Sequence, residues 1–138
     1  MKRIIIILIG LTLINCGRGS PIAPEVLAGV YDLQAVKVDL GSGGRALVYL
    51  NDESQEHSAS GFIELNVDRT YRLFASFGDV DQSIWETQGK YGVNSRFELT
   101  FSTPGRNFSG SFFNKQSRIA VTELFAGSVV LMVFDRAR

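Results

Sequence analysis

The side chains best suited to nucleophilic or metal chemistry are scarce in this chain of 138 residues. Cys16 is the only cysteine and His57 is the only histidine. His57 lies in a polar stretch with Asp52, Glu53 and Glu56, but a zinc site needs three or four ligands, usually imidazole or thiolate. A serine triad would need the histidine beside a serine and a carboxylate, and the spacing supports no such arrangement. We therefore interpret residues 51–60 as a solvated loop without a metal ion.

Two other motifs fall short of the sites that they partly match. Asp79 and Asp81 lack the third ligand, the glycine and the later glutamate of a calcium-binding loop. The glycine-rich stretch 41–44 is not set between a strand and a helix, as a phosphate-binding loop would be. Both stretches are interpreted as turns. We expect no metal and no cofactor, and we expect that the protein is not an enzyme.

The lone thiol is better explained by the residues that precede it. Lys2 and Arg3 are followed by an apolar run from Ile4 to Ile14, which is the pattern of a secretory signal peptide. The run is too short for a transmembrane helix, which needs about 20 apolar residues. The chain is therefore predicted to be exported.

The four residues Leu13-Ile14-Asn15-Cys16 resemble the lipobox of bacterial lipoproteins. This resemblance implies that residues 1–15 are removed, that Cys16 carries acyl chains such as palmitate, and that residues 16–25 form a flexible tether. Two or more chains hold a protein stably on a membrane. The expected location is the cell envelope. Gly17 stands where some lipoproteins of the inner membrane have an aspartate, so we expect the outer membrane in a cell that has one. In other cells we expect the plasma membrane. A plainly cleaved export signal is the alternative.

Composition limits what the remaining body can be. Loss of residues 1–15 leaves 123 residues, enough for one domain, with twelve basic and fourteen acidic side chains. Since the arginines are spread singly and no basic patch stands out, nucleic acid is not an expected partner. The body has no other thiol, so its stability must come from its core and not from disulfides.

Period-two alternation of apolar and polar residues dominates the body. It predicts strands over 61–67, 71–77, 85–93, 96–101, 107–113, 117–124 and 128–134, with turns between them. One helical turn is expected within 23–29, where Pro24 is suited to a helix start. Eight or nine short strands favour an all-β fold, an antiparallel up-and-down β-barrel over residues 26–138, because closure removes exposed edges. A β-sandwich is the alternative.

The body also resembles the lipocalin-like domains of bacterial envelope proteins. Residues 29–33 (GVYDL) are similar to the Gly-x-Trp opening of that family, and 61–73, 89–91 and 130–136 are similar to its later strands. The resemblance implies an eight-stranded barrel that is closed at one end and open at the other. It also implies that Arg136 packs across the ring of Tyr31 as a cation–π pair. The alternative is that Arg136 is a solvated terminal residue.

The apolar faces of the predicted strands hold the candidate ligand-cavity or core residues. Such residues either fill a small barrel or line a pocket for an apolar guest. They are Tyr31, Leu33, Leu65, Tyr71, Leu73, Phe77, Trp85, Tyr91, Phe97, Leu99 and Phe101. Phe62, Phe74 and Phe113 lie instead on polar faces, and would form a partner-binding patch if they came together.

Two functions follow from these patterns. The first is a lipid-anchored envelope protein that binds a small hydrophobic ligand in its barrel. The second is a filled barrel without a ligand, serving as a structural or protein-interaction module with an envelope protein as its partner. An enzyme that shelters an apolar substrate is a more distant third, and would need an ionisable side chain that faces the interior.

Overall fold

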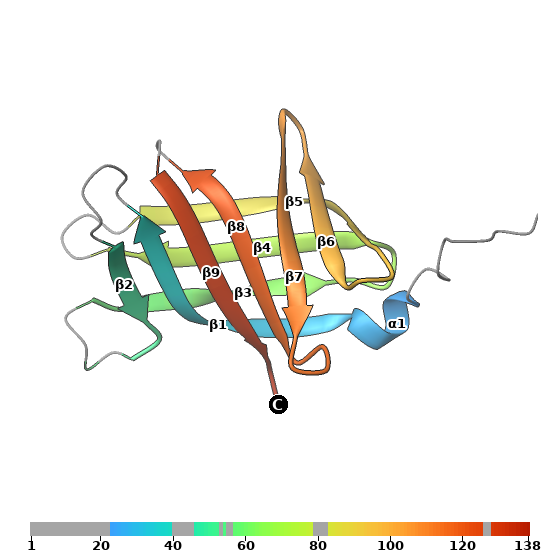
Figure 1. Cartoon of the computed structure of the whole chain (residues 1–138), viewed down its shortest axis with the longest axis horizontal. Helices are drawn as coiled ribbons and strands as arrows, with labels where there is room; N and C mark the ends of the chain where they lie inside the picture. Colours follow the sequence, from blue (N-terminus) through green and yellow to red (C-terminus); the bar gives the residue numbers. More distant parts are fainter. Residues whose placement is uncertain (1–22, 40–45, 53, 55–56, 79–82, 126–127) are drawn as a thin grey trace, which may run out of the picture.

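The computed structural model describes residues 23–39, 46–52, 54, 57–78, 83–125 and 128–138. The predictions for Cys16, for residues 41–44 and for Asp79 and Asp81 fall outside these ranges. One short helix, α1, spans Pro24–Leu27. The strands are β1 (Gly29–Asp39), β2 (Ala46–Leu50), β3 (Ala59–Leu65), β4 (Thr70–Phe77), β5 (Ser83–Val93), β6 (Glu98–Thr103), β7 (Arg106–Phe113), β8 (Arg118–Phe125) and β9 (Ser128–Arg136). Figure 1 shows β6–β9 lying across β3–β5.

The strands form a closed antiparallel barrel. From β3 to β9 each strand pairs with the next along the chain, and β9 returns to pair with β1 from Tyr31↔Arg136 to Asp39↔Val129. β1 completes the ring by pairing with β3. Eight strands thus close the barrel and β2 is an addition to it, which confirms the prediction of an all-β barrel over a sandwich.

β2 is present because β1 is longer than the part of it that β3 can cover. β3 pairs with β1 at residues 29–32, and β2 pairs with β1 at residues 35–39. The change of partner occurs at a register shift between Leu33 and Ala35. Asn51 bridges this point, because its side-chain amide donates to the Leu33 carbonyl at 2.8 Å and its backbone N–H donates to the Gln34 carbonyl.

Short polar side chains set the turns. Asp68 accepts hydrogen bonds from the backbone N–H and the hydroxyl of Thr70, while Arg69 has a positive φ of 68°. In the next turn but one, the Asn94 side chain accepts from the N–H groups of Arg96 and Glu98. Such side-chain bonds replace the ladder bonds that a strand would supply.

Phe97 departs from the strand predicted over 96–101. Its φ is +61° and β6 begins at Glu98, because the Asn94 turn takes up the preceding residues. Phe97 is only partly buried and packs against the core. The strand prediction was therefore wrong at its first two residues.

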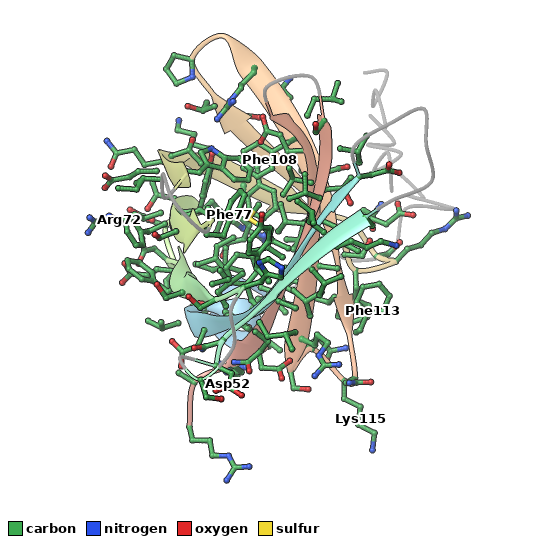
Figure 2. The ribbon with its side chains drawn as sticks, turned by 90° about the vertical axis from the view of Figure 1, so that its left-hand side faces the viewer. Asp52, Arg72, Phe77, Phe108, Phe113 and Lys115 are labelled. Atoms are coloured by element: carbon green, nitrogen blue, oxygen red, sulfur yellow. The ribbon has the colours of Figure 1, made fainter. Side chains whose placement is uncertain are left out.

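The core lies inside the barrel, where the inward side chains of successive strands meet. All the candidate cavity or core residues named above except Phe97 are buried. They are joined by apolar residues from β7, β8 and β9, among them Phe108, Phe112, Ile119, Met132 and Phe134. Figure 2 shows Phe77 and Phe108 among these inward side chains. Over the ranges that the structure describes, no helix has the length and apolar character needed to span a membrane.

Candidate functional site

One end of the barrel is held by Tyr31 and Arg136. The Arg136 guanidinium carbon lies 5.6 Å from the centroid of the Tyr31 ring. Arg136 also donates to the carbonyl oxygens of Val26 and Ala28, at 3.2 and 2.9 Å, and the Tyr31 hydroxyl donates to the Leu27 carbonyl at 2.8 Å. The structure thus brings together the two residues that the resemblance paired. Together they hold α1 against the barrel, which is a structural role.

Four inward rings pack together inside the barrel. Tyr71, Trp85, Phe101 and Phe108, which we call the aromatic cluster, come from β4, β5, β6 and β7. The ring centroids of Phe101 and Phe108 are 4.7 Å apart, those of Tyr71 and Phe101 are 4.9 Å apart, and those of Trp85 and Phe108 are 5.7 Å apart. At these separations the rings touch, so side chains fill this level of the barrel.

The hairpin of β6 and β7 separates from its neighbours above the aromatic cluster. Pairing between β7 and β8 begins at Ser109↔Thr122, although β7 starts at Arg106 and β8 continues to Phe125. Figure 1 shows the tip of this hairpin standing away from β8. The separation opens a cleft of about 470 Å³, here called the β7–β8 cleft. Its lining residues are Arg106, Asn107, Phe108, Ser109, Thr122, Glu123, Leu124 and Val129.

Glu123 is the ionisable group of the β7–β8 cleft that is most deeply buried, with its side chain only 6% exposed. Its Oε1 accepts from the Arg106 guanidinium at 3.0 Å, whereas its Oε2 is buried and has no hydrogen-bond partner. Burial raises the pKa of Glu123 above its ordinary value, and the positive charge of Arg106 opposes that rise. An unpaired buried carboxylate oxygen is costly, and such groups are found more often at functional sites than elsewhere.

Arg106 joins the cleft to the aromatic cluster. Its guanidinium carbon lies 5.5 Å from the centroid of the Trp85 ring, so one side chain covers the indole and neutralises the carboxylate. Arg106 also borders a second open cleft of about 490 Å³ between β5 and the hairpin, which includes Thr87. Inside the barrel the hydroxyls of Thr87 and Tyr71 are 3.3 Å apart. Polar groups are therefore gathered where the hairpin leaves the barrel.

His57 lies against an aromatic ring. Its ring centroid is 5.6 Å from that of Tyr49, in an edge-on arrangement, and its carbonyl accepts from the Leu50 N–H. Within the part of the chain that the structure describes, no three histidine, cysteine, aspartate or glutamate side chains are grouped as metal ligands.

Two of the three outward phenylalanines pack against each other, and the third lies apart from them. Phe62 and Phe74 stack across β3 and β4 with ring centroids 6.2 Å apart, and the guanidinium of Arg72 lies 5.7 Å from the Phe62 centroid. Phe113 is exposed on β7. Figure 2 places Arg72 and Phe113 on opposite sides of the barrel. The three rings therefore do not gather into one patch.

Sequence reasoning overlooked Glu123, although its position carried a signal. In the run 118–124 the residues that share its face, Ile119 and Val121, are buried, so alternation directs the carboxylate inward. The same alternation leaves Leu124 exposed. This strand therefore has a charged residue on its inward, apolar face and a leucine on its outward, polar face. Such an exchange is unusual and indicates a candidate site.

Comparisons with models of protein families and with curated proteins find no match to this chain.

Proposed function

We propose that the protein is a lipid-anchored, lipocalin-like barrel of the bacterial cell envelope that binds a small hydrophobic ligand. The closed antiparallel barrel supports the lipocalin-like part of this proposal. The anchor rests on the lipobox-like residues that end at Cys16, and the proposal assigns no reaction to the protein.

The observation that carries ligand binding is the β7–β8 cleft. Its volume of about 470 Å³ is within the range of small-molecule sites, which is roughly 300–1,000 Å³. It combines apolar walls with one buried carboxylate, which is the usual composition of such sites. Because the rings of the aromatic cluster already fill the interior near Trp85, we place the ligand in this cleft and not deep within the barrel.

The fluorescence of Trp85 provides the test. It is the only tryptophan of the chain, and it contacts both Phe108 and Arg106, which line the β7–β8 cleft. Titration with an apolar probe, heptyl methyl ether, should change the emission of Trp85 along a saturable curve. An emission that stays constant, or that changes only linearly with probe concentration, would contradict ligand binding.

A second candidate function is a filled barrel that acts as a protein-interaction module. The outer face of β2, β1, β9 and β8 favours it, because Val48, Leu50, Leu124 and Val129 are exposed there. Lys37 pairs with both Val48 and Leu131, which places the apolar residues of β2 and β9 on either side of β1. Exposed apolar areas of this kind are common at protein interfaces. A constant Trp85 emission in the titration above would favour this second function.

A further inference from the structure

Glu123 presents an unused acceptor at the floor of the β7–β8 cleft. Its Oε2 has no hydrogen-bond partner, while its Oε1 is engaged by Arg106. The side chain is more than nine-tenths buried, so bulk water does not satisfy this oxygen. Buried polar atoms nearly always have a partner, so this exception requires an explanation.

The charges of Glu123 and Arg106 determine which kind of ligand group can bind beside Oε2. Arg106 neutralises the carboxylate across 3.0 Å, so the pair as a whole carries no net charge. A cation would meet the positive guanidinium, and an anion would meet the carboxylate. A neutral hydroxyl or amide N–H group is repelled neither by the guanidinium nor by the carboxylate. It also donates the hydrogen bond that Oε2 lacks.

The walls of the cleft suit an apolar body attached to that donor. Phe108 lies at its inner side, and Leu124 and Val129, which pair across β8 and β9, are 69% and 45% exposed. Covering these two side chains removes apolar surface from water, which is favourable by roughly 25 cal/mol per Å². A ligand that spans from Glu123 to Leu124 therefore has contacts for both of its parts.

We propose that the β7–β8 cleft binds a neutral amphiphile whose hydroxyl or N–H donor bonds to Glu123 Oε2 and whose apolar chain covers Phe108, Leu124 and Val129. This inference rests on the proposed function and specifies the ligand class for the same site. Arg106 engages only Oε1, so a donor that binds Oε2 leaves this ion pair intact.

Two isomeric probes test the donor directly. 1-Octanol and heptyl methyl ether have the same atoms, but only the alcohol can donate a hydrogen bond. Both are titrated against the purified protein carrying Cys16→Ser, so that no attached acyl chain competes, with the emission of Trp85 as the readout. The alcohol should bind about tenfold more tightly, since one buried hydrogen bond is worth on the order of tenfold in affinity.

Two variants assign the preference to Glu123. Glu123→Met removes the acceptor and should make the two probes bind equally. Glu86→Met removes the acidic partner of another cross-strand pair, Arg72–Glu86, and should keep the tenfold preference.

The possible outcomes test the proposed ligand class and the proposed function separately. Equal, saturable binding of both probes to the protein with an intact Glu123 would overturn this inference and leave the proposed ligand binding standing. A preference that persists in Glu123→Met would also overturn it. If neither probe changes the emission of Trp85, the proposed function fails and the inference fails with it.

Discussion

Glu123 illustrates how one residue can oppose stability. Its carboxylate is removed from water, and one of its oxygens has no hydrogen bond in return. The attraction of Arg106 offsets only part of that desolvation, since a buried ion pair often contributes less than apolar residues of similar volume. A group of this kind fits a binding site better than a structural core.

Glu123→Met should therefore raise the free energy of unfolding at neutral pH, by about 1–3 kcal/mol. The half-exposed Arg106 returns to water in this variant, so no new buried charge is created. Chemical denaturation of the two proteins provides the measurement. Glu86→Met is the matched control, because its ion pair with Arg72 is exposed and its loss should change stability by less than about 1 kcal/mol. A destabilised Glu123→Met would show that the buried pair contributes to stability.

The same comparison has a predicted dependence on pH. The raised pKa of Glu123 means that the folded protein takes up this proton at a higher pH than the unfolded chain does. Between the ordinary pKa and the raised one, the native protein gains stability as the pH falls, and Glu123→Met does not. The advantage of the variant should thus be full above the raised pKa and shrink below it. An advantage that stays constant across this range would contradict the account.

Arg136, at the end of the barrel that holds α1, is expected to stabilise the fold, in contrast to Glu123. Arg136→Ala removes its hydrogen bonds to Val26 and Ala28 and its contact with the Tyr31 ring. We expect a loss of about 1–3 kcal/mol in the free energy of unfolding, measured by denaturation. The exposed Arg138→Ala is the control and should have almost no effect. An equal effect of the two substitutions would indicate that Arg136 is only a solvated terminal residue.

At the scale of elements, the separation of the β6–β7 hairpin depends on how closely β6 can first approach β5. Gly89 permits that approach, since a Cβ at this position would lie only 2.0 Å from the Ser102 carbonyl oxygen. Pairing of β5 with β6 starts at the next residue, with Lys90↔Ser102. The hairpin is thus anchored at Gly89, and beyond this point it leaves the barrel wall.

Gly89→Ala should therefore destabilise the protein by more than about 2 kcal/mol, because backbone must move to admit the methyl group. Gly92→Ala, on the same strand, is a close control: its Cβ would meet no atom within 4 Å, and the effect should be small. Thermal unfolding of both variants gives the comparison. Similar melting temperatures for the two variants would show that the close contact at Ser102 does not restrain the hairpin.

Alternation predicted strands that correspond to β3–β9, and the up-and-down prediction gave the pairing of each with the next, whereas β2 and its pairing with β1 were not predicted. Alternation along 71–77 and 118–124 identifies inward and outward residues, because successive side chains of a strand point to opposite faces. Alternation does not state which strands meet, so the change of partner at Gln34 and the addition of β2 were not foreseen. For the site, alternation places Glu123 on the inward face of β8, but only the structure shows that Arg106, seventeen residues earlier, pairs with it.

For the whole molecule, we propose that a lipid anchor at the N-terminus holds a ligand-binding barrel at the membrane. α1 begins at Pro24, so it takes up the last two residues of the predicted tether (16–25), and it lies at one end of the barrel in Figure 1. The β7–β8 cleft lies along the hairpin that rises at the upper edge of the same view. In the proposed arrangement the tether leads to α1, and the cleft is open to the surroundings.

Replacement of the proposed acylation site tests the anchor in cells. Cys16→Ser should abolish incorporation of labelled fatty acid and release the protein from the membrane fraction, since no acyl chain remains to hold it. Cell fractionation with metabolic labelling is the measurement, and Ser20→Ala, within the same predicted tether, is the control. A Cys16→Ser protein that remains labelled and membrane-bound would contradict lipidation at this residue.

The central claim is that the barrel carries a small hydrophobic amphiphile in the β7–β8 cleft, and organic extraction of the purified protein tests it most directly. Mass spectrometry of the extract should detect a stoichiometric amphiphile in the native protein and in Ser95→Trp, whose substitution lies in an exposed turn. The same molecule should be lost from Ser109→Trp, in which the new indole occupies the cleft. Extracts without any bound amphiphile, from protein produced in several bacterial hosts, would contradict the claim.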